Sequence, residues 1–299
     1  MLRAERLASH GPQIGARLIV ASHRQRNDRR NGPKKAEYDP AGSAPSAPGK
    51  PPSRPRASPR EAASAEWIWG VHPVIAALEN PARETIKRVL ATPDRARQIA
   101  ERFTALKVLE VTDGQSIGRV LPQGAAHQGL ALRAPPPEPL SVEELGEPAQ
   151  GFLLMLDQVT DPQNVGAIFR SAAAFGARGV IVQDRHAPAL TGALAKAAAG
   201  AVDKIPHARA VNLSRALEQL EAMGWRAVGL DGEAPADLAA VLDGRPTVIV
   251  MGSEGEGLRR LVREHCDALA RIPMPGGFES LNVSAAAAVA LYAASRAVA

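Results

Sequence analysis

One cysteine, Cys266, occurs in the 299-residue chain, and this scarcity excludes a disulfide framework and any metal site built from several thiolates. It gives no reason to place the protein outside a reducing compartment, so we expect a cytoplasmic protein. No run of 18 or more apolar residues is present, so we expect no membrane-spanning helix. The N-terminal residues also lack the long apolar stretch of a secretory signal peptide.

Metal and phosphate motifs are missing as well. His265 precedes Cys266, but two adjacent ligands cannot close a tetrahedral site, and the seven histidines are scattered along the chain. We therefore expect no metal, and we expect Cys266 to pack as a small apolar side chain. The G-K-[ST] sequence of a P-loop does not occur. These absences favour a protein that binds its ligand through loops.

Positive charge is concentrated in the first 60 residues. They hold 13 Lys and Arg against 4 Asp and Glu, a charge of +9, so the other residues carry −4 of the total of +5. The same segment contains nine of the 25 prolines and few apolar side chains. We interpret residues 1–64 as a disordered, basic, Pro-rich tail, because this composition cannot offset the entropy lost on ordering. An organellar transit peptide, a variable extension and a misassigned start codon all fit it, and whether the tail binds a polyanion stays open.

Residues 65–134 are expected to form a small α/β domain. Trp67–Trp69 belongs to the segment that opens its first helix, at 74–78. Consecutive prolines then break regular structure, so residues 135–150 are interpreted as a polar linker. The remaining expected elements of this domain are strands at 86–91, 108–111 and 129–132 and a helix at 94–106.

Residues 151–299 are expected to form a second, larger α/β domain. Short, continuous apolar runs alternate with helical segments, a pattern typical of a parallel sheet that is covered on both faces. The expected strands are 152–156, 180–182, 227–230 and 248–251, and the expected helices are 164–175, 190–200, 213–223, 257–265 and 283–296.

The first polar cluster of this domain runs from a buried strand through a loop into a helix, over residues 156–171. Asn164 can cap this helix, and Arg170 follows six residues later, about 240° around an ideal helix. Both side chains face one cleft only if Asn164 lies in the cap. Taken locally, an ordinary cap and a solvated arginine also explain these residues.

The second cluster, residues 251–257, directly follows an expected strand. Its three glycines let the backbone approach a ligand at the sheet edge where open α/β sheets bind ligands. Their order, G-x-x-G-x-G, differs from the dinucleotide-binding order and argues against a dinucleotide enzyme. Glu254 would lie next to the ligand, although a solvated loop carboxylate fits the sequence as well.

The third cluster, residues 272–284, is an irregular Pro- and Gly-shaped loop before an Ala-rich helix. Ser280, Asn282 and Ser284 place hydroxyl and amide groups at the helix start. A capping cluster is the simpler interpretation of these three residues.

Together the three clusters resemble the motifs of the SpoU/TrmH (SPOUT) family of RNA ribose 2′-O-methyltransferases. The resemblance rests on NVGAIFRSAAAFGA (164–177), VIVMGSEGEGL (248–258) and IPMPGGFESLNVSAAAAVALY (272–292). Upstream, WGVHPVIAALEN (69–80) and AHQGLAL (126–132) resemble the substrate-binding domain of the branch that methylates guanosines of 23S ribosomal RNA. The resemblance covers about residues 67–299.

This resemblance implies a trefoil-knotted α/β domain, S-adenosylmethionine as methyl donor, RNA as substrate and a homodimer. It implies catalytic roles for Asn164, Arg170, Glu254, Ser280 and Asn282. By the same resemblance, the donor is held mainly by the backbone around Gly252, Ile272, Met274 and Leu281.

Two alternatives stay open at this stage. A transfer RNA ribose methyltransferase of the same family would carry the same three motifs. A non-catalytic ribosomal RNA-binding assembly factor could retain the fold, although the presence of all the polar motif residues argues against it. Arginine is normally always protonated, so Arg170 is more readily interpreted as a group that orients the 2′-oxygen than as a base.

Overall fold

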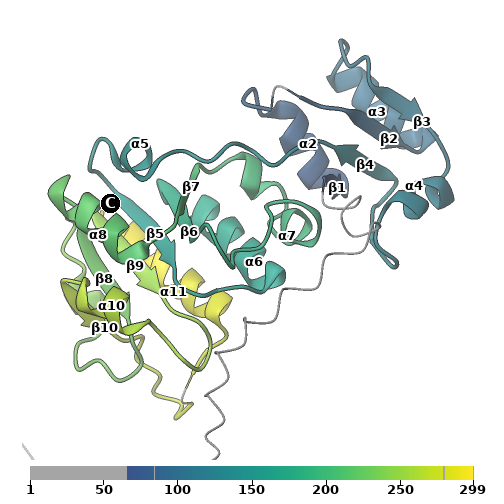
Figure 1. Ribbon diagram of the computed structural model, residues 1–299. Coiled ribbons are helices and arrows are strands. Elements are labelled where there is room, and N and C mark those ends of the chain that lie inside the picture. The colour runs from purple at the N-terminus through teal and green to yellow at the C-terminus, as the bar shows by residue number, and fades with distance from the viewer. Residues whose placement is uncertain (1–65, 84, 279, 299) are drawn as a thin grey trace, which may run out of the picture. The chain divides into compact units, whose positions relative to one another are not determined.

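A computed structural model of the chain describes residues 66–83, 85–278 and 280–298. The predicted tail, residues 1–64, lies outside them. The chain folds around two sheets (Figure 1). The elements around the first sheet are β1 (Trp67–Trp69), α2 (Val71–Glu79), β2 (Arg88–Ala91), α3 (Pro93–Arg102), β3 (Leu109–Val111), α4 (Gly114–Val120) and β4 (Leu130–Arg133).

The first sheet has four strands in the order β1-β4-β2-β3, and only the β2/β3 pair is parallel. The expected strands and helices of this region are present within a few residues. The prediction that Trp67–Trp69 opens a helix is wrong, because these residues form β1 and pair with β4. Three residues are too few to show strand periodicity, and the partner strand lies more than 60 residues away in sequence.

The second sheet has six parallel strands in the order β10-β8-β9-β5-β6-β7. Its strands are β5 (Phe152–Leu156), β6 (Gly179–Gln183), β7 (His207–Ala210), β8 (Arg226–Leu230), β9 (Thr247–Met251) and β10 (Ala268–Ala270). Its helical segments are α5 (Val142–Gly146), α6 (Pro162–Ala174), α7 (Gly192–Ala197), η1 (Ala201–Asp203), α8 (Leu213–Ala222), α9 (Leu238–Val241), α10 (Arg260–Glu264) and α11 (Val283–Ala297).

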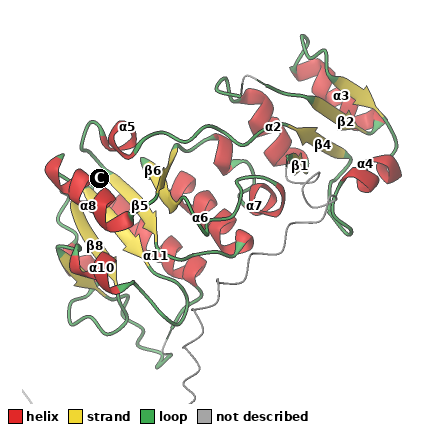
Figure 2. Ribbon diagram, in the orientation of Figure 1, coloured by secondary structure: helices red, strands yellow, loops and turns green. Residues whose placement is uncertain are grey.

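Helices cover both faces of this sheet, as the continuous apolar runs predict (Figure 2). Leu154 and Ile249 point to the face packed by α6 and α11. Their neighbours Leu153 and Val248 point to the opposite face, which is packed by α5, α8 and α10. Successive strand residues alternate between faces, so every position must be apolar when both faces are buried. The predicted doubly covered parallel sheet is therefore confirmed.

Two strands, β7 and β10, and three short helices, α4, α5 and α9, were not expected from the sequence. β7 and β10 are the edge strands of the six-stranded sheet, and neither is a continuous run of large apolar residues. The supposed linker contains α5, which begins with a capping box between Ser141 and Glu144. These short elements are specified by pairing and capping contacts rather than by hydrophobic periodicity.

His207 is a buried histidine at the start of β7, 3% exposed, with the edge of the Phe169 ring 6.4 Å away between centroids. Burial, aided by the nearby charge of Arg209, lowers the pKa of His207 to about 4. The unfolded chain therefore binds more protons than the folded chain between pH 4 and 6.5.

Acidification through this range is expected to reduce the free energy of unfolding by about 3 kcal/mol through His207 alone. The contribution of His207 to the free energy of unfolding should be fully present above pH 6.5 and should fall progressively as the pH approaches 4. Urea titrations of the wild type and of His207→Leu, which cannot titrate, measure the contribution of this group. An equal pH dependence in both proteins would contradict the assignment.

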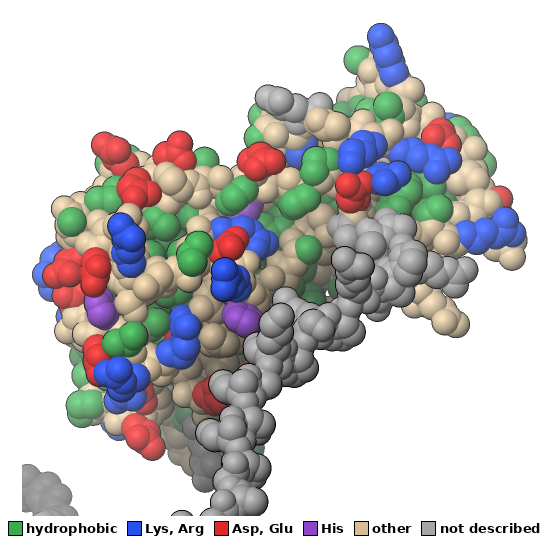
Figure 3. Space-filling model, in the orientation of Figure 1, with side chains coloured by type: hydrophobic (Ala, Val, Ile, Leu, Met, Phe, Trp, Pro, Cys, Tyr) green, Lys and Arg blue, Asp and Glu red, His purple; other side chains and the backbone are tan. Residues whose placement is uncertain are grey.

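Most basic side chains of the first sheet region are neutralised by carboxylates. On the face in Figure 3, Lys and Arg side chains lie interspersed with Asp and Glu side chains. Lys87 and Arg133 share Glu66, and Arg88 pairs with Glu110. The others are Arg97 with Asp94, Arg102 with Glu79 and Arg83 with Asp203.

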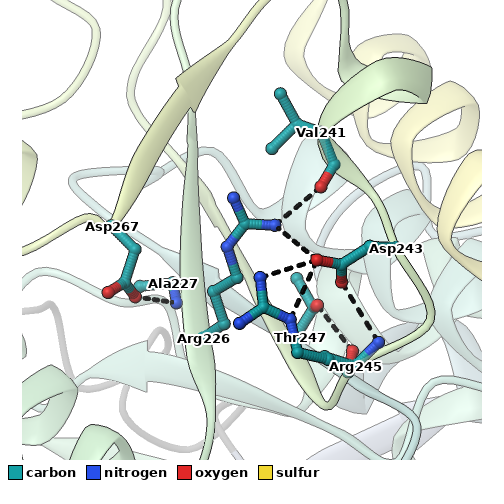
Figure 4. Close-up of polar contacts among 7 residues, drawn as sticks. All are labelled: Arg226, Ala227, Val241, Asp243, Arg245, Thr247 and Asp267. Carbon is teal, nitrogen blue, oxygen red and sulfur yellow. Dashed lines mark hydrogen bonds and ion pairs between the residues drawn. The ribbon is translucent and has the colours of Figure 1, made fainter.

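A polar cluster ties the amino ends of β8 and β9 to the chain between them (Figure 4). Arg226 donates to the Val241 carbonyl oxygen at 2.6 Å, and its guanidinium lies 3.4 Å from Asp243. Arg245 donates to the same carboxylate at 2.6 and 2.8 Å and, with Arg226, holds the pKa of Asp243 at about 2. This cluster lies at the edge opposite the polar motifs, so it serves the fold.

Candidate active site

The three polar motifs meet at the carboxyl edge of the six-stranded sheet. β5 and β9 are paired neighbours, so the loops that follow them, residues 157–161 and 252–257, leave the sheet side by side. The third motif leads into α11, which packs against both α6 and β9. Parallel strands bring their carboxyl ends to one edge, and this edge is where such sheets bind ligands.

A hydrogen-bonded network joins one residue from each motif. The Asn282 side-chain amide donates to Asn164 Oδ1 at 3.1 Å and to Glu254 Oε1 at 2.9 Å. The Val283 backbone N–H donates to the same Glu254 oxygen at 3.0 Å. The Glu254 carboxylate therefore fixes both the Asn282 side chain and the start of α11, and all three groups are held close together.

Helix capping at this edge differs from the sequence-based expectation. Asp161, not Asn164, caps α6, and its carboxylate accepts from the Asn164 N–H at 2.8 Å. Asn164 lies three residues into the helix, which leaves its side chain available to Asn282. Asn282 itself caps α11, and its Oδ1 accepts from the Ser284 N–H at 3.0 Å and from the Ser284 hydroxyl at 2.6 Å.

Arg170 is exposed on α6 and does not join this network. Because Asn164 is helical, the six-residue spacing turns the two side chains to different sides of α6. Among the residues that the structure describes, Arg170 has no carboxylate partner. Its guanidinium is therefore free to contact a ligand that extends beyond the network.

A cavity of about 500 Å³ adjoins the network. Glu254 and Ser280 line it, whereas Asn164, Arg170 and Asn282 do not. The four residues predicted to hold the donor, Gly252, Ile272, Met274 and Leu281, all line it. The volume lies within the range of small-molecule sites, and the lining combines apolar side chains with a few polar groups.

The loop of residues 252–257 folds back on itself so tightly that position 252 has room only for glycine. A Cβ at this position would lie 2.1 Å from the carbonyl carbon of Gly257, and the Gly257 N–H donates to the Ser253 carbonyl oxygen at 3.1 Å. Gly257 also adopts a φ of +67°, which L-residues with side chains rarely adopt. The glycines thus let the chain fold tightly on itself. The sequence alone predicted close approach to a ligand and did not indicate this structural role.

Asp157 is a further polar residue at this edge, and the sequence reading did not single it out. Its side chain is fully buried at the end of β5, and it accepts from the Arg259 backbone N–H at 2.9 Å and from Nε at 2.7 Å. This ion pair fastens the start of α10, and so the end of the glycine loop, to β5. An aspartate at the end of a wholly apolar run is the signal that could have found it.

Within residues 66–83, 85–278 and 280–298, no group of three or more His, Cys, Asp or Glu side chains could hold a metal ion. Burial raises the pKa of Cys266 to about 12, and its thiol donates to the Val262 carbonyl oxygen at 3.3 Å. No helix in this part of the chain is long and apolar enough to span a bilayer.

Comparisons with known proteins agree with this geometry. A family model described as the SpoU rRNA Methylase family matches residues 151–292, and a model described as RNA 2′-O ribose methyltransferase substrate binding matches residues 67–140. The chain is 41% identical over 242 residues to the 23S rRNA (guanosine-2′-O-)-methyltransferase RlmB of Xylella fastidiosa, covering 77% of this chain and 96% of that protein. It is 39% identical over 244 residues to a protein of Mycolicibacterium smegmatis described as an uncharacterized tRNA/rRNA methyltransferase, covering 78% of this chain and 76% of that protein.

Solved structures show the same fold. An AdoMet-bound rRNA methyltransferase from Sinorhizobium meliloti superposes with a TM-score of 0.65 at 28% identity, over 77% of this chain and 86% of that chain. The SpoU methyltransferase AviRb from Streptomyces viridochromogenes, in complex with AdoMet, gives 0.66 at 25% identity, over 80% and 93%. From its motifs, its fold and these relatives, the chain belongs to the SpoU rRNA methylase family.

Proposed function

We propose that this protein transfers a methyl group from S-adenosylmethionine to the 2′-oxygen of a ribose in RNA, a guanosine of 23S ribosomal RNA. The observation that carries the proposal is the Asn164–Asn282–Glu254 network beside a cavity of cofactor size. The RlmB relative acts on 23S ribosomal RNA, and the match to a substrate-binding domain favours the ribosomal substrate over transfer RNA. We place this activity in the cytoplasm.

The cavity fits the methyl donor. Leu230, Ile272 and Met274 offer apolar surface for a purine. Gly252 and Leu281 would contribute backbone groups. When bound, the donor supplies an electrophilic methyl group on a sulfonium, which needs no further activation.

Protein side chains must then position and activate the ribose 2′-hydroxyl, which is a weak acid and a poor nucleophile. In our proposal, Arg170 orients the 2′-oxygen or a neighbouring phosphate and stabilises negative charge as the proton departs. Asn164 and Asn282 hold polar groups of the substrate in register, and Glu254 keeps Asn282 oriented. Ser280 lines the cavity, so in this proposal it contacts the bound methyl donor.

RNA binding by residues 65–134 would depend on shape and exposed bases more than on bulk charge. Six of the nine Lys and Arg residues between positions 65 and 134 are paired with carboxylates. Arg95, Lys107 and Arg119 keep no ion pair among the described residues, so they are the better candidates for phosphate contacts. In this proposal, residues 135–150 link the RNA-binding region to the methyltransferase domain, residues 151–299.

An apolar stripe on α11 supports a homodimer. Val289 is 44% exposed and Tyr292 is 56% exposed, three residues apart on one side of the helix, with Ala285 exposed one turn earlier. Apolar groups on an exposed helix face are typical of a surface that another chain covers. We further propose that the chain forms the family's trefoil knot. The Glu254 bond to Val283 supports this, because it holds the last helix against the glycine loop.

The function is tested by incubating the protein with tritiated donor and undermethylated ribosomal or transfer RNA, then mapping linkages that resist alkali. We expect label in ribosomal RNA at a linkage that resists cleavage, because a 2′-O-methyl group removes the attacking hydroxyl. Label in transfer RNA alone would favour the other branch of the family. Methylation of a base would overturn the ribose assignment, and RNA binding without transfer would indicate an assembly factor.

A further inference from the structure

Lys196, on α7, is a partly buried lysine that forms no ion pair with any Asp or Glu of the described residues. Its ammonium donates to Gln128 Oε1 at 2.9 Å, in the loop before β4. Gly70 leaves room for the ammonium, because a Cβ at position 70 would overlap Lys196 Nζ. Burial lowers the pKa of Lys196, since the charged form loses hydration. An uncompensated positive charge at such a position is costly, so it points to an anion that arrives with a ligand.

Another contact between the two sheet regions is neutralised by a carboxylate. Arg83 forms an ion pair with Asp203 of η1, and both side chains are 2% exposed. Arg83 Nη2 donates to Asp203 Oδ2 at 3.2 Å, and Asn80 Nδ2 donates to Asp203 Oδ1 at 3.1 Å. This buried pair already holds the two regions together, so the charge of Lys196 is not needed for that purpose.

Gln128 also brings a second cation to this place. Arg95 Nε donates to the Gln128 backbone carbonyl oxygen at 3.2 Å, and Arg95 Nη1 donates to Gln98 Oε1 at 2.7 Å. Gln128 Oε1 accepts from the Val71 N–H at 3.2 Å as well as from Lys196, whereas the Gln128 Nε2 group has no acceptor among the described residues. Gln128 adopts a φ of +56°, a costly conformation of the kind found at functional sites. The group therefore offers N–H donors and positive charge to a ligand that accepts hydrogen bonds.

This group of donors lies close to the first polar motif. Ala197, the residue after Lys196, lies directly against α6, because a Cβ at Gly166 would be 2.6 Å from the Cβ of Ala197. Gly166 lies between Asn164 and Arg170 in the motif. α7 also contacts β1 of the first sheet (Figure 1). An anion bound at Lys196 would thus lie between the motif and the region that we propose to bind RNA.

We propose that Lys196, Gln128 and Arg95 together bind a phosphate of the RNA backbone close to the target ribose. The inference rests on the proposed function, because it assumes an RNA substrate. A phosphodiester suits the site, since its oxygens accept hydrogen bonds and it carries the negative charge that the site lacks. Such a contact reads no base, so its role is to position the RNA chain.

Titration of a labelled, unmethylated ribosomal RNA transcript at several potassium chloride concentrations tests the contact. Lys196→Ala is expected to weaken RNA binding roughly 10-fold, the lower end of the effect of a hydrogen bond to a charged group. The slope of log K against log salt should become less steep by about 0.7 to 1, the value for one lost phosphate contact. KM for RNA should rise by the same factor as the dissociation constant. Binding of S-adenosylhomocysteine should stay unchanged, because Lys196 does not line the cavity.

Gln128→Glu separates phosphate binding from a structural role of Lys196. The new carboxylate keeps an oxygen for Lys196 and for the Val71 N–H, so the fold should be at least as stable as in the wild type. It also neutralises Lys196 and repels a phosphate, so RNA affinity should fall at least as far as in Lys196→Ala. If Lys196 only held the loop in place, the same variant would bind RNA as well as the wild type or better. Melting temperatures without RNA check folding independently of affinity.

Arg215→Ala is the matched control for net charge. It removes one exposed positive charge from α8, on the other face of the sheet, and should bind RNA like the wild type. Wild-type RNA affinity in Gln128→Glu overturns the inference, as does an unchanged salt dependence in Lys196→Ala. Failure of the wild type to bind RNA while it binds S-adenosylhomocysteine overturns the proposed function instead.

Discussion

Replacing Arg170 with alanine is expected to reduce single-turnover methylation at saturating donor by roughly 100- to 1000-fold, the usual effect of removing a group that stabilises developing oxyanion charge. The guanidinium is exposed and carries no ion pair among the described residues, so its removal leaves no buried charge behind. Arg170 also does not line the cavity, so the dissociation constant of S-adenosylhomocysteine should stay unchanged.

Two companion variants sharpen this experiment. Arg170→Lys keeps the charge but not the planar fork of donors, so it should be intermediate in rate. Arg215→Ala removes an exposed arginine from α8, on the other face of the sheet, and should be as active as the wild type. Near-normal methylation by Arg170→Ala would show that this residue neither orients nor activates the 2′-oxygen.

Replacing Glu254 with alanine is expected to lower turnover roughly 10- to 100-fold, because misplacement of catalytic groups by about 1 Å has effects of up to this size. The carboxylate accepts from Asn282 Nδ2 at 2.9 Å and from the Val283 N–H at 3.0 Å. Without it, Asn282 keeps its bond to Asn164 at 3.1 Å, but the start of α11 loses its tie to the glycine loop.

The matched control for Glu254 lies two residues along the same loop. Glu256 is exposed and lines the same cavity, and its side chain makes no hydrogen bond within the described residues, so Glu256→Ala should retain activity. Glu254→Gln keeps one oxygen that can accept and should fall between the two. Single-turnover rates and ligand-free melting temperatures measure these effects, and equal rates for the Glu254 and Glu256 variants would refute the positioning role.

Continuous apolar runs predicted four of the six strands of the larger sheet. The runs at β5, β6, β8 and β9 are largely apolar at successive positions because both faces of the sheet are buried. Such burial therefore produces a pattern that can be recognised in the sequence. The residues of an edge strand such as β7 are less constrained to be apolar, so the strand has a weaker sequence pattern. Short elements such as β1 and α5 depend on partners or caps that no local pattern reveals.

The sequence by itself determined the parallel sheet and the edge at which the three motifs must lie, because strands that alternate with helices run in one direction and bring their carboxyl ends to one edge. Only the tertiary structure decided which side chains meet. Asn282 bonds Asn164 across 118 residues and Glu254 across 28, and Asn164 can do so because Asp161, not Asn164, caps α6. Contacts between residues distant in sequence depend on loop closure and packing, and these leave no periodic trace along the chain.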